Sequence, residues 1–324
     1  MLSPKEIQDT VKQLFDSENF ISDPVELYEP IQYTLGLGGK RLRPTLLLAA
    51  CDMFGGDIGK ASAAAVGIEV FHNFTLLHDD LMDKSPLRRG KETVYRRWNE
   101  NIAILSGDTM FAMAYRYFLK EWHPNMEAIL KTFTETAIGV CDGQQYDMNF
   151  ETQDDVAIAE YIMMIRLKTA ILLAGAMKIG ALYANAPEKD IELLYKAGIS
   201  MGLAFQLQDD LLDAYGDVSV FGKQTGTDIK DNKKTYLYLS ALKEGDKSQK
   251  ETLQRLFKTT PENPDEKIRT VIGIYDSLNI KALVEKDIEM YIDQSLMYLD
   301  EINLGNDRKE TMKQIINQLL GRKI

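Results

Sequence analysis

Two acidic clusters with the same spacing are the residues of this sequence best suited to chemistry. They are Asp79-Asp80-x-x-Asp83 and Asp209-Asp210-x-x-Asp213. On a helix, residues four apart lie one above the other, so the outer carboxylates of each cluster point the same way. Each cluster ends an apolar stretch just before a helix breaker, Pro86 or Gly216. Carboxylates are disfavoured at a helix C-terminus unless cations neutralise them, and hard oxygen ligands in open sets suit Mg²⁺.

Two other kinds of site could contain such clusters. A single cluster fits a solvated polar helix end as well as a metal site, but two copies in the same setting favour the metal site. A di-iron carboxylate bundle needs Glu-x-x-His pairs on two helices. Only one such pair occurs, Glu69 with His72, so the sequence disfavours a di-iron centre.

Basic residues accompany the acidic clusters. Gly38-Gly39-Lys40-Arg41-Leu42-Arg43-Pro44 places three cations on a glycine-led turn into a helix, and a helix N-terminus favours phosphate. Arg88-Arg89-Gly90-Lys91 follows the first cluster, and arginine forks bind phosphate oxygens in pairs. Lys168 lies in an otherwise apolar helix, where an unpaired lysine is costly. A network of salt bridges to the aspartates is the alternative, but it does not explain the glycines. The pattern therefore indicates an anion bridged by metal.

The elements that position these residues are predicted to be helices. Apolar residues recur at the helical period, and strand-like alternation is nearly absent. The predicted helices are Ala61–Leu77, Ala103–Leu119, Met126–Ile138, Ala157–Tyr183, Ile191–Leu212, Thr235–Lys243, Lys250–Phe257, Lys267–Ser277 and Ile280–Leu299. Breakers lie between them, and no low-complexity linker divides the chain. We therefore predict an all-α fold with a single domain over residues 1–324.

Composition excludes several classes of partner. The net charge of −11 argues against non-specific binding to nucleic acid or to an anionic membrane. No apolar stretch reaches the roughly 20 residues of a membrane span, and the first residues lack the layout of a signal peptide. The two cysteines, Cys51 and Cys141, form no disulfide framework, which is typical of a reduced cytoplasmic protein.

Together the motifs resemble those of the trans-type polyprenyl (short-chain isoprenyl) diphosphate synthases, most of all geranylgeranyl and farnesyl diphosphate synthases. The resemblance runs from Gly39 to Lys233. It rests on the ordered motifs GGKRLRP, LLHDDLMDKSPLRRG, Gly107-Asp108, Gly143-Gln144-x-x-Asp147, Lys168-Thr169, FQLQDDLLD and FGKQTGTD. It implies one helical polyprenyl synthase domain around a deep central cavity, usually in a homodimer of isoprenoid biosynthesis.

The resemblance also implies the reaction. Isopentenyl diphosphate is condensed head to tail with an allylic diphosphate (dimethylallyl, geranyl or farnesyl), and pyrophosphate is released. A proton is then lost to the released diphosphate, so no dedicated protein base is required.

The resemblance assigns roles to individual residues. Three Mg²⁺ ions would be held by Asp79, Asp83 and Asp209, with Asp80, Asp147, Asp210 and Asp213 as auxiliary ligands. The allylic diphosphate would be held by Arg88, Lys168, Thr169, Gln206, Lys223 and Lys233. Isopentenyl diphosphate would be held by Lys40, Arg43, His72 and Arg89, with Phe205 beside them. The catalytic set is then Asp79, Asp80, Asp83, Lys168, Thr169, Asp209 and Lys223. Arg322 and Lys323 resemble a basic tail that can fold over the site.

Product length is predicted from the helix that carries the first cluster. Phe74 and Phe71 lie about 7.5 and about 12 Å before Asp79 along a helix, and Thr75 is small. Both phenylalanines also fit an ordinary core. In the family, an aromatic residue at the position of Phe74 is typical of enzymes that stop at geranylgeranyl diphosphate. Enzymes that make farnesyl diphosphate often carry a second aromatic residue at the position of Thr75. We therefore predict geranylgeranyl diphosphate as the main product and farnesyl diphosphate as the next.

Two rival functions have distinguishing features. A class I terpene cyclase shares the fold, but it usually has an Asn/Ser/Glu metal triad in place of the second aspartate cluster and lacks the GGKRLRP motif. A catalytically silent regulatory subunit tends to lose an aspartate cluster, and this sequence retains both.

Overall fold

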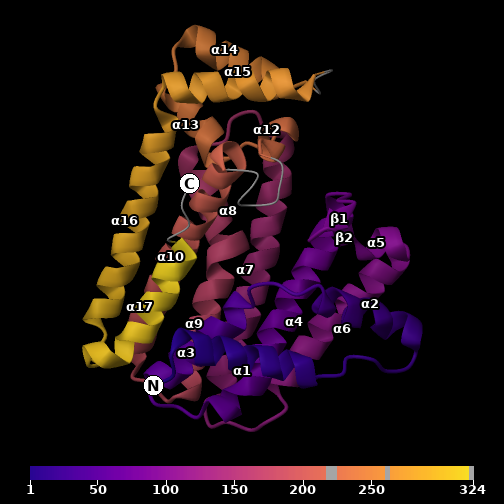
Figure 1. Cartoon of the computed structure of the whole chain (residues 1–324), viewed down its shortest axis with the longest axis vertical. Helices are drawn as coiled ribbons and strands as arrows, with labels where there is room; N and C mark the ends of the chain where they lie inside the picture. The colour runs from indigo at the N-terminus through magenta and orange to yellow at the C-terminus, as the bar shows by residue number, and fades with distance from the viewer. Residues whose placement is uncertain (217–224, 260–262, 321–324) are drawn as a thin grey trace. The chain divides into compact units, whose positions relative to one another are not determined.

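The computed structural model describes residues 1–216, 225–259 and 263–320, and these residues are almost entirely helical (Figure 1). The prediction of an all-α fold is confirmed. The chain divides into two compact units. The first unit contains Met1–Phe133, Ala176–Ile191 and Leu304–Met312. The second contains Thr134–Gly175, Glu192–Asn303 and Lys313–Ile324.

Four of the five passages of the chain between the units lie inside helices, and the fifth lies in the loop between Asn303 and Leu304. These helices are α7 (Met126–Thr152), α9 (Ile171–Tyr183), α10 (Glu188–Tyr215) and α17 (Asn306–Leu320). Each carries the chain from one unit into the other without a linker. The single domain over residues 1–324 stays a prediction, and these uninterrupted helices support it.

The remaining elements of the first unit form a helical core with one short hairpin. They are α1 (Pro4–Ser17), α2 (Val25–Gly36), α3 (Leu42–Met53), α4 (Ile58–Met82), β1 (Leu87–Arg88), β2 (Lys91–Glu92), α5 (Val94–Arg97) and α6 (Glu100–Phe118). Helices α4 and α6 lie side by side (Figure 1). A Cβ at Gly67 of α4 would lie 3.0 Å from the backbone oxygen of Ala114 in α6, so glycine permits this close packing.

Helix α4 places the first aspartate cluster at its end. Asp57 caps its N-terminus, where the side chain accepts a hydrogen bond from the N–H of Gly59 at 2.9 Å. Val66, Val70 and Leu77 face the buried core of the first unit. The helix ends at Met82, with Asp83 as its C-cap. Helix α4 is therefore anchored by its buried apolar residues and carries the carboxylates of the first aspartate cluster at its C-terminus.

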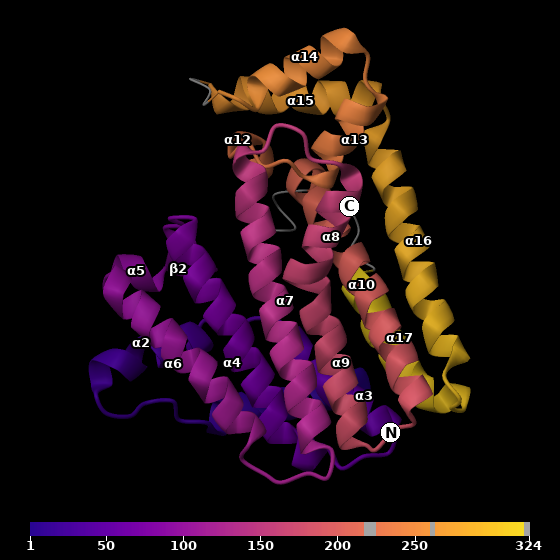
Figure 2. The ribbon, with the colours of Figure 1, turned by 180° about the vertical axis from the view of Figure 1, so that it is seen from behind.

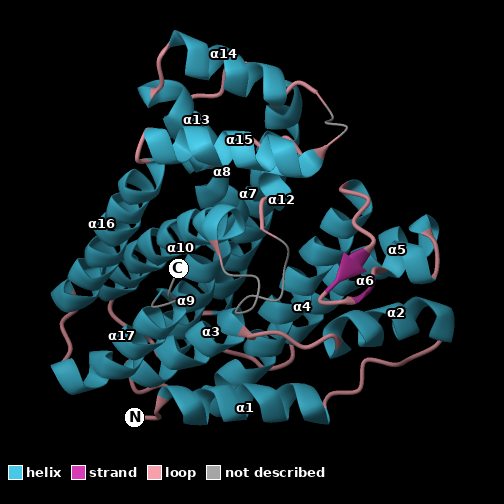
Figure 3. Cartoon of the chain, turned by 45° about the horizontal axis from the view of Figure 1, so that its top comes forward, coloured by secondary structure: helices cyan, strands magenta, loops and turns pink. Residues whose placement is uncertain are grey.

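The remaining elements of the second unit surround the end of α10, which carries the second cluster. They are α8 (Ile158–Ile165), the π-helical turn η1 (Arg166–Ala170), α12 (Thr227–Lys230), α13 (Tyr236–Glu244), α14 (Lys247–Leu256), α15 (Pro264–Ser277) and α16 (Ile280–Glu301). Helices α13, α14 and α15 lie together (Figure 3). Helix α16 lies along α10 (Figure 2), where Ser295 Oγ donates to the backbone oxygen of Ala197 at 2.8 Å.

The structure departs from the predicted elements in several places. Helices α1, α2 and α17 lie outside the predicted ranges, and α7 continues to Thr152, beyond the predicted end at Ile138. The predicted helix Ala157–Tyr183 begins as α8 and is interrupted by η1 before it continues as α9. The hairpin β1–β2 was not predicted, because strands of two residues leave no alternation to detect. In the described residues, no helix has both the length and the apolar character that crossing a membrane requires.

Candidate active site

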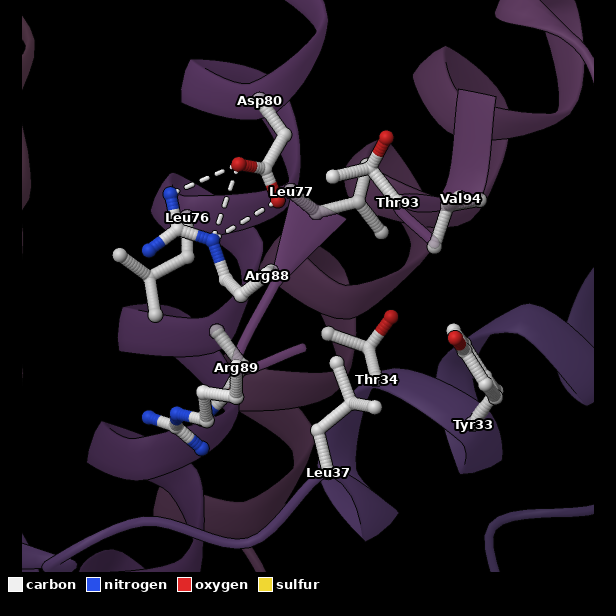
Figure 4. Close-up of a pocket in the computed structure, with 11 residues that line it drawn as sticks. Tyr33, Thr34, Leu37, Leu76, Leu77, Asp80, Arg88, Arg89, Thr93 and Val94 are labelled. Carbon is white, nitrogen blue, oxygen red and sulfur yellow. Dashed lines mark hydrogen bonds and ion pairs between the residues drawn. The ribbon is translucent and has the colours of Figure 1, made fainter. Parts of the chain in front are cut away.

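Asp79, Asp80 and Asp83 have different surroundings at the end of α4. Asp80 is buried and forms a bidentate ion pair with Arg88, whose Nη2 and Nε lie 2.7 and 2.8 Å from its carboxylate oxygens (Figure 4). Burial raises the pKa of Asp80, and Arg88 opposes that rise. Asp83 is exposed and Asp79 half-buried. The N–H of Asp83 donates to the backbone oxygen of Asp79 at 2.8 Å, so these two residues lie one helical turn apart.

The hairpin after α4 sends two neighbouring arginines in different directions. Arg89 and Gly90 occupy its tip and both have positive φ, 53° and 74°, which fits a two-residue turn of type I′. Arg88 points to Asp80, whereas Arg89 is directed away from it (Figure 4). The small pocket drawn there has about 10 Å³ of free space, which holds about one water molecule. It is therefore a junction between arginines and not a substrate cavity.

Arg89 lies against the glycine-led turn before α3. A Cβ at Gly39 would lie 2.6 Å from both terminal nitrogens of Arg89, and the φ of Gly39 is +128°. A side chain at this position would both clash and be strained, so only glycine fits. The motifs that begin with Gly38 and with Arg88, about fifty residues apart in the sequence, therefore meet in the first unit.

Arg43 and His72 lie near Arg89, and these three residues together with Lys40 form the basic pocket. The pKa of Arg43 is lowered to about 10, chiefly by burial, which Glu69 opposes and to which Arg89 adds. Burial and the nearby arginines, Arg43 and Arg89 foremost, hold the pKa of His72 well below its usual 6.5, so this ring is neutral. Arg43 Nε has no hydrogen-bond partner in the part of the chain that the structure describes. Lys40 is exposed at the same turn. The pocket has positive charge and unmet hydrogen-bonding capacity, which suits an anion.

Glu69 is bonded within the protein. Its carboxylate lies 3.0 Å from Arg41 Nη1 and 3.2 Å from Asn73 Nδ2. A di-iron centre is disfavoured because the sequence has only one Glu-x-x-His motif and because the Glu69 carboxylate is already bonded to Arg41 and Asn73. Arg41 and Glu69 were not among the predicted site residues, although Arg41 lies within the GGKRLRP motif.

The second aspartate cluster is arranged around a buried carboxyl. Asp210 accepts hydrogen bonds from the hydroxyl of Tyr161 and from Gln206 Nε2, the latter at 3.0 Å. Burial and the neighbouring Asp228 raise the pKa of Asp210 to about 7. The Asp213 carboxylate accepts from the Thr227 hydroxyl and from the N–H of Asp228 at 2.9 Å. Asp210 and Asp213 are therefore held by protein groups.

Asp228 and Tyr161 were missed in the sequence. Asp228 lies in the FGKQTGTD motif, and burial raises its pKa to about 6, opposed chiefly by Lys233. Lys233 Nζ lies 3.9 Å from the Asp228 carboxylate. The motif was a signal for Asp228, whereas nothing in the sequence distinguishes Tyr161 from the other core tyrosines.

The π-helical turn η1 places Lys168 and Thr169. Lys168 Nζ lies 2.6 Å from Asp147, and Thr169 Oγ1 donates to Gln206 Oε1 at 2.9 Å. A Cβ at Gly143 of α7 would lie 2.3 Å from the backbone nitrogen of Lys168. Thr169, Gln206 and Asp210 thus form one hydrogen-bonded series in the second unit, and Phe205 is half-buried beside it. Lys223, Arg322 and Lys323 lie outside the described residues.

Aromatic side chains fill the space below the first cluster. The ring of Phe74 lies 5.5 Å from that of Phe71, 5.4 Å from Phe111 and 4.8 Å from His78. Phe71 is fully buried. The Thr75 hydroxyl donates to the backbone oxygen of His72 at 2.8 Å. Phe111 of α6 was not predicted, because only the three-dimensional packing of α6 on α4 brings it to Phe74.

Within the described residues, no group of three His, Cys, Asp or Glu side chains is arranged to hold a metal ion alone. Mg²⁺ is usually bound by one or two carboxylates together with water and substrate phosphates, and the half-buried Asp79 and exposed Asp83, one helical turn apart, are carboxylates of this kind.

Comparisons with known proteins agree on one family. Residues 24–274 match the family model of the polyprenyl synthetases. A geranylgeranyl diphosphate synthase of Methanosarcina mazei is 38% identical over 69% of this chain and 70% of its own. A geranylfarnesyl diphosphate synthase of Natronomonas pharaonis is 37% identical over 74% of this chain and 76% of its own. A crystal structure of geranylgeranyl pyrophosphate synthase superposes with a TM-score of 0.94 at 43% identity, covering 100% of both chains.

Proposed function

Because this chain belongs to the polyprenyl synthetase family, we propose that it is a prenyltransferase that condenses isopentenyl diphosphate with an allylic diphosphate. One observation carries the proposal. The neighbouring residues Arg88 and Arg89 join the first aspartate cluster, through Asp80, to a basic pocket at Gly39, Arg43 and His72. A condensation of two diphosphates requires both kinds of phosphate site.

The aspartate clusters are proposed to hold the allylic diphosphate through Mg²⁺. Asp79, Asp83 and Asp209 are the ligands that the family resemblance implies for three ions. Bound Mg²⁺ stabilises the charge that develops on the departing diphosphate. Asp80, Asp210 and Asp213 accept hydrogen bonds from protein groups, which supports a role in orienting these ligands. Asp147 is held in the same way by Lys168.

Cations of the chain would hold the same diphosphate directly. The proposed set is Arg88, Lys168, Lys223 and Lys233, with Gln206 and Thr169 in support. As the C1–O bond of the allylic substrate breaks, diphosphate leaves with the electron pair. The double bond of isopentenyl diphosphate then forms the new bond to C1, and a proton passes to the released diphosphate. Lys168 and Thr169, on the irregular backbone of η1, are proposed to stabilise the allylic cation.

The basic pocket is proposed to hold isopentenyl diphosphate without metal. Arg43, Arg89 and the neutral His72 lie there with Lys40, and Phe205 would flank the bound chain. Charge-assisted hydrogen bonds from guanidinium groups to phosphate are among the strong ones.

Elongation with each primer tests this function. The purified chain would be incubated with Mg²⁺, labelled isopentenyl diphosphate and dimethylallyl, geranyl or farnesyl diphosphate in separate reactions. We expect elongation and release of pyrophosphate. No elongation with any primer would refute the proposal, and a silent subunit would release no pyrophosphate. A terpene cyclase would convert geranylgeranyl diphosphate to a hydrocarbon; retention of the second aspartate cluster and of the basic pocket disfavours that activity.

Geranylgeranyl diphosphate is the proposed main product, with farnesyl diphosphate next. The aromatic group of Phe71, Phe74 and Phe111 lies below Asp79 and supports a floor for the growing chain. Phe74→Ala should allow at least one further isoprene unit, because it removes the ring nearest Asp79. Chromatography of the dephosphorylated products would measure this, with Phe257→Ala, whose ring packs on Tyr238, as the control. Unchanged product length in Phe74→Ala would exclude Phe74 as the floor.

A homodimer and a cytoplasmic location complete the proposal. Ile104, Leu105 and Leu119 are large apolar side chains exposed on or next to α6, and such patches are typical of interfaces. The location is inferred from cysteine usage. Sedimentation of the purified chain would test the dimer.

A further inference from the structure

Arg41 differs from the other cations of its motif because it points into the protein. It is the N-cap of α3 and has a left-handed backbone, with φ of 47° and ψ of 42°. Its guanidinium bonds Glu69 of α4 at 3.0 Å and the backbone oxygen of Leu35 in the last turn of α2. It also lies 4.2 Å from the ring centre of Phe15 in α1. One side chain thus ties the turn to three helices, in a backbone conformation that residues other than glycine rarely adopt.

Glu69 is the carboxylate on which this arrangement depends. Its side chain is only 2% exposed, and Asn73 Nδ2 holds the same oxygen as Arg41 does. A buried carboxylate is costly unless it is paired and hydrogen-bonded. Glu69 also favours the charged forms of Arg43 and Arg89, against the burial that lowers the pKa of each.

The charges of the pocket explain why such a pair is needed. Arg89 disfavours the positive charge of Arg43, and Arg41 disfavours that of Arg89. All three arginines disfavour the charged form of His72. Glu69 neutralises Arg41, while Arg43 and Arg89 remain as positive charges. Arg43 Nε and Glu69 Oε2 have no hydrogen-bond partner within the described residues. Arg43 therefore has a hydrogen-bond donor, its Nε–H, available for an anion.

We propose that Arg41 and Glu69 are a positioning pair for the metal-free diphosphate pocket: they hold the turn at Gly39 and the α3 N-terminus so that Arg43 and Arg89 converge on one diphosphate. Neither residue of the pair touches the diphosphate. This inference rests on the proposed function of that pocket and adds two residues to which the reaction itself assigns no role.

The test separates the two substrates. Arg41→Gln and Glu69→Gln should each raise the KM for isopentenyl diphosphate about tenfold, which corresponds to about 1.4 kcal/mol, and leave the KM for the allylic diphosphate within about twofold. Arg41→Lys keeps the charge but loses the planar fork, so its KM should fall between those of the wild type and Arg41→Gln. Arg97→Gln is the matched control, because Arg97 also stacks on an aromatic ring, 4.6 Å from the centre of Tyr33, but lies outside the pair.

Binding without turnover makes the test independent of the reaction. Isopentenyl diphosphate would be titrated calorimetrically into each variant in EDTA, with circular dichroism as a check of folding. We expect weaker binding in the pair variants and wild-type binding in Arg97→Gln. If the wild type binds but transfers no prenyl group, the proposed function fails while the pair is still tested. Wild-type affinity in folded Arg41→Lys and Glu69→Gln, or an equal rise of both KM values, would overturn the positioning pair.

Discussion

Asp79 and Asp80 are neighbours in one motif, yet their surroundings assign them different work. The carboxylate of Asp80 is buried and engaged by Arg88 through three short contacts. Asp79 is half-buried at the same helix end, one turn before the exposed Asp83. The sequence motif alone does not distinguish Asp80, which pairs with Arg88, from Asp79, which is proposed to bind a metal ion.

This difference predicts different effects of two similar substitutions. Asp80→Asn should lower the free energy of unfolding by about 1.5–3 kcal/mol, because it weakens hydrogen bonds to a charged group. Asp79→Asn should cost less stability in EDTA than Asp80→Asn, since it relieves like charges at a helix C-terminus. It should lower kcat by about 10²–10³, the typical loss of one transition-state contact. Urea unfolding and primer elongation would measure both. Equal stability of the two variants would contradict the assignment.

His72 predicts a pH dependence at the same scale. Its pKa in the folded chain lies well below 6.5, so the unfolded chain takes up a proton below about pH 6.5 while the folded chain does not. The stability that depends on neutral His72 is therefore present above pH 6.5 and is lost as the pH falls towards the folded pKa. Urea midpoints between about pH 7.5 and about pH 5 should fall more steeply in the wild type than in His72→Gln. Parallel curves would show that neither burial nor the nearby arginines depress this pKa.

Several site residues were recognisable in the sequence because their chemistry conflicts with their position. Aspartates at a helix C-terminus and Lys168 in an apolar helix are costly without a partner, so each signals a site. Tyr161 and Phe111 carry no such conflict, since a buried aromatic residue is ordinary. Their contacts with Asp210 and Phe74 arise from packing between segments distant in the sequence.

At the scale of elements, the π-helical turn η1 depends on glycines in its neighbours. A Cβ at Gly143 of α7 would lie 2.3 Å from the backbone nitrogen of Lys168, and one at Gly202 of α10 would lie 2.5 Å from Ala170 Cα. Helices α7 and α10 thus pack closely on η1 at glycines, where no side chain separates the backbones. A π-turn is common at functional sites, and here it carries Lys168 and Thr169.

Replacing Gly143 should therefore disturb both packing and catalysis. Gly143→Ala should lower the free energy of unfolding by about 1–3 kcal/mol, as overpacking does, and lower kcat because the ion pair of Lys168 with Asp147 shifts. Gly273→Ala on the exposed face of α15 is the control, since nothing lies within 4 Å of its added Cβ. That control should gain up to about 1 kcal/mol from helix propensity. A Gly143→Ala variant as stable and active as the wild type would show that η1 needs no such space.

The elements themselves were predictable where one physical signal dominates. Helical periodicity marks α4, α6 and α10, and Pro86 and Gly216 mark the ends of the two that carry aspartates. The interruption at η1 was not predictable, because its residues have the same apolar period as the helices on either side. The hairpin at Arg89-Gly90 depends on two positive φ values in a turn between strands of two residues, too short a pattern to stand out from a loop.

At the scale of the whole molecule, the open question is whether two compact units unfold as one. The boundary crosses α7, α9, α10 and α17 inside their helical spans. Unfolding one unit would break the hydrogen-bond ladders of four helices that the other unit also uses. This continuity favours a single cooperative domain over residues 1–324.

The two tryptophans allow a direct test. Trp98 and Trp122 both lie in the first unit, so their fluorescence follows that unit, whereas far-ultraviolet circular dichroism follows helices of both. We expect the two signals to change at the same urea concentration, because coincident transitions are the mark of cooperative unfolding. A Trp98→Phe, Trp122→Phe, Phe257→Trp variant moves the fluorescent reporter to the second unit, where Phe257 packs 4.1 Å from Tyr238. Its midpoint should again match that of the circular dichroism, whereas two separated midpoints would establish two domains that share helices but not stability.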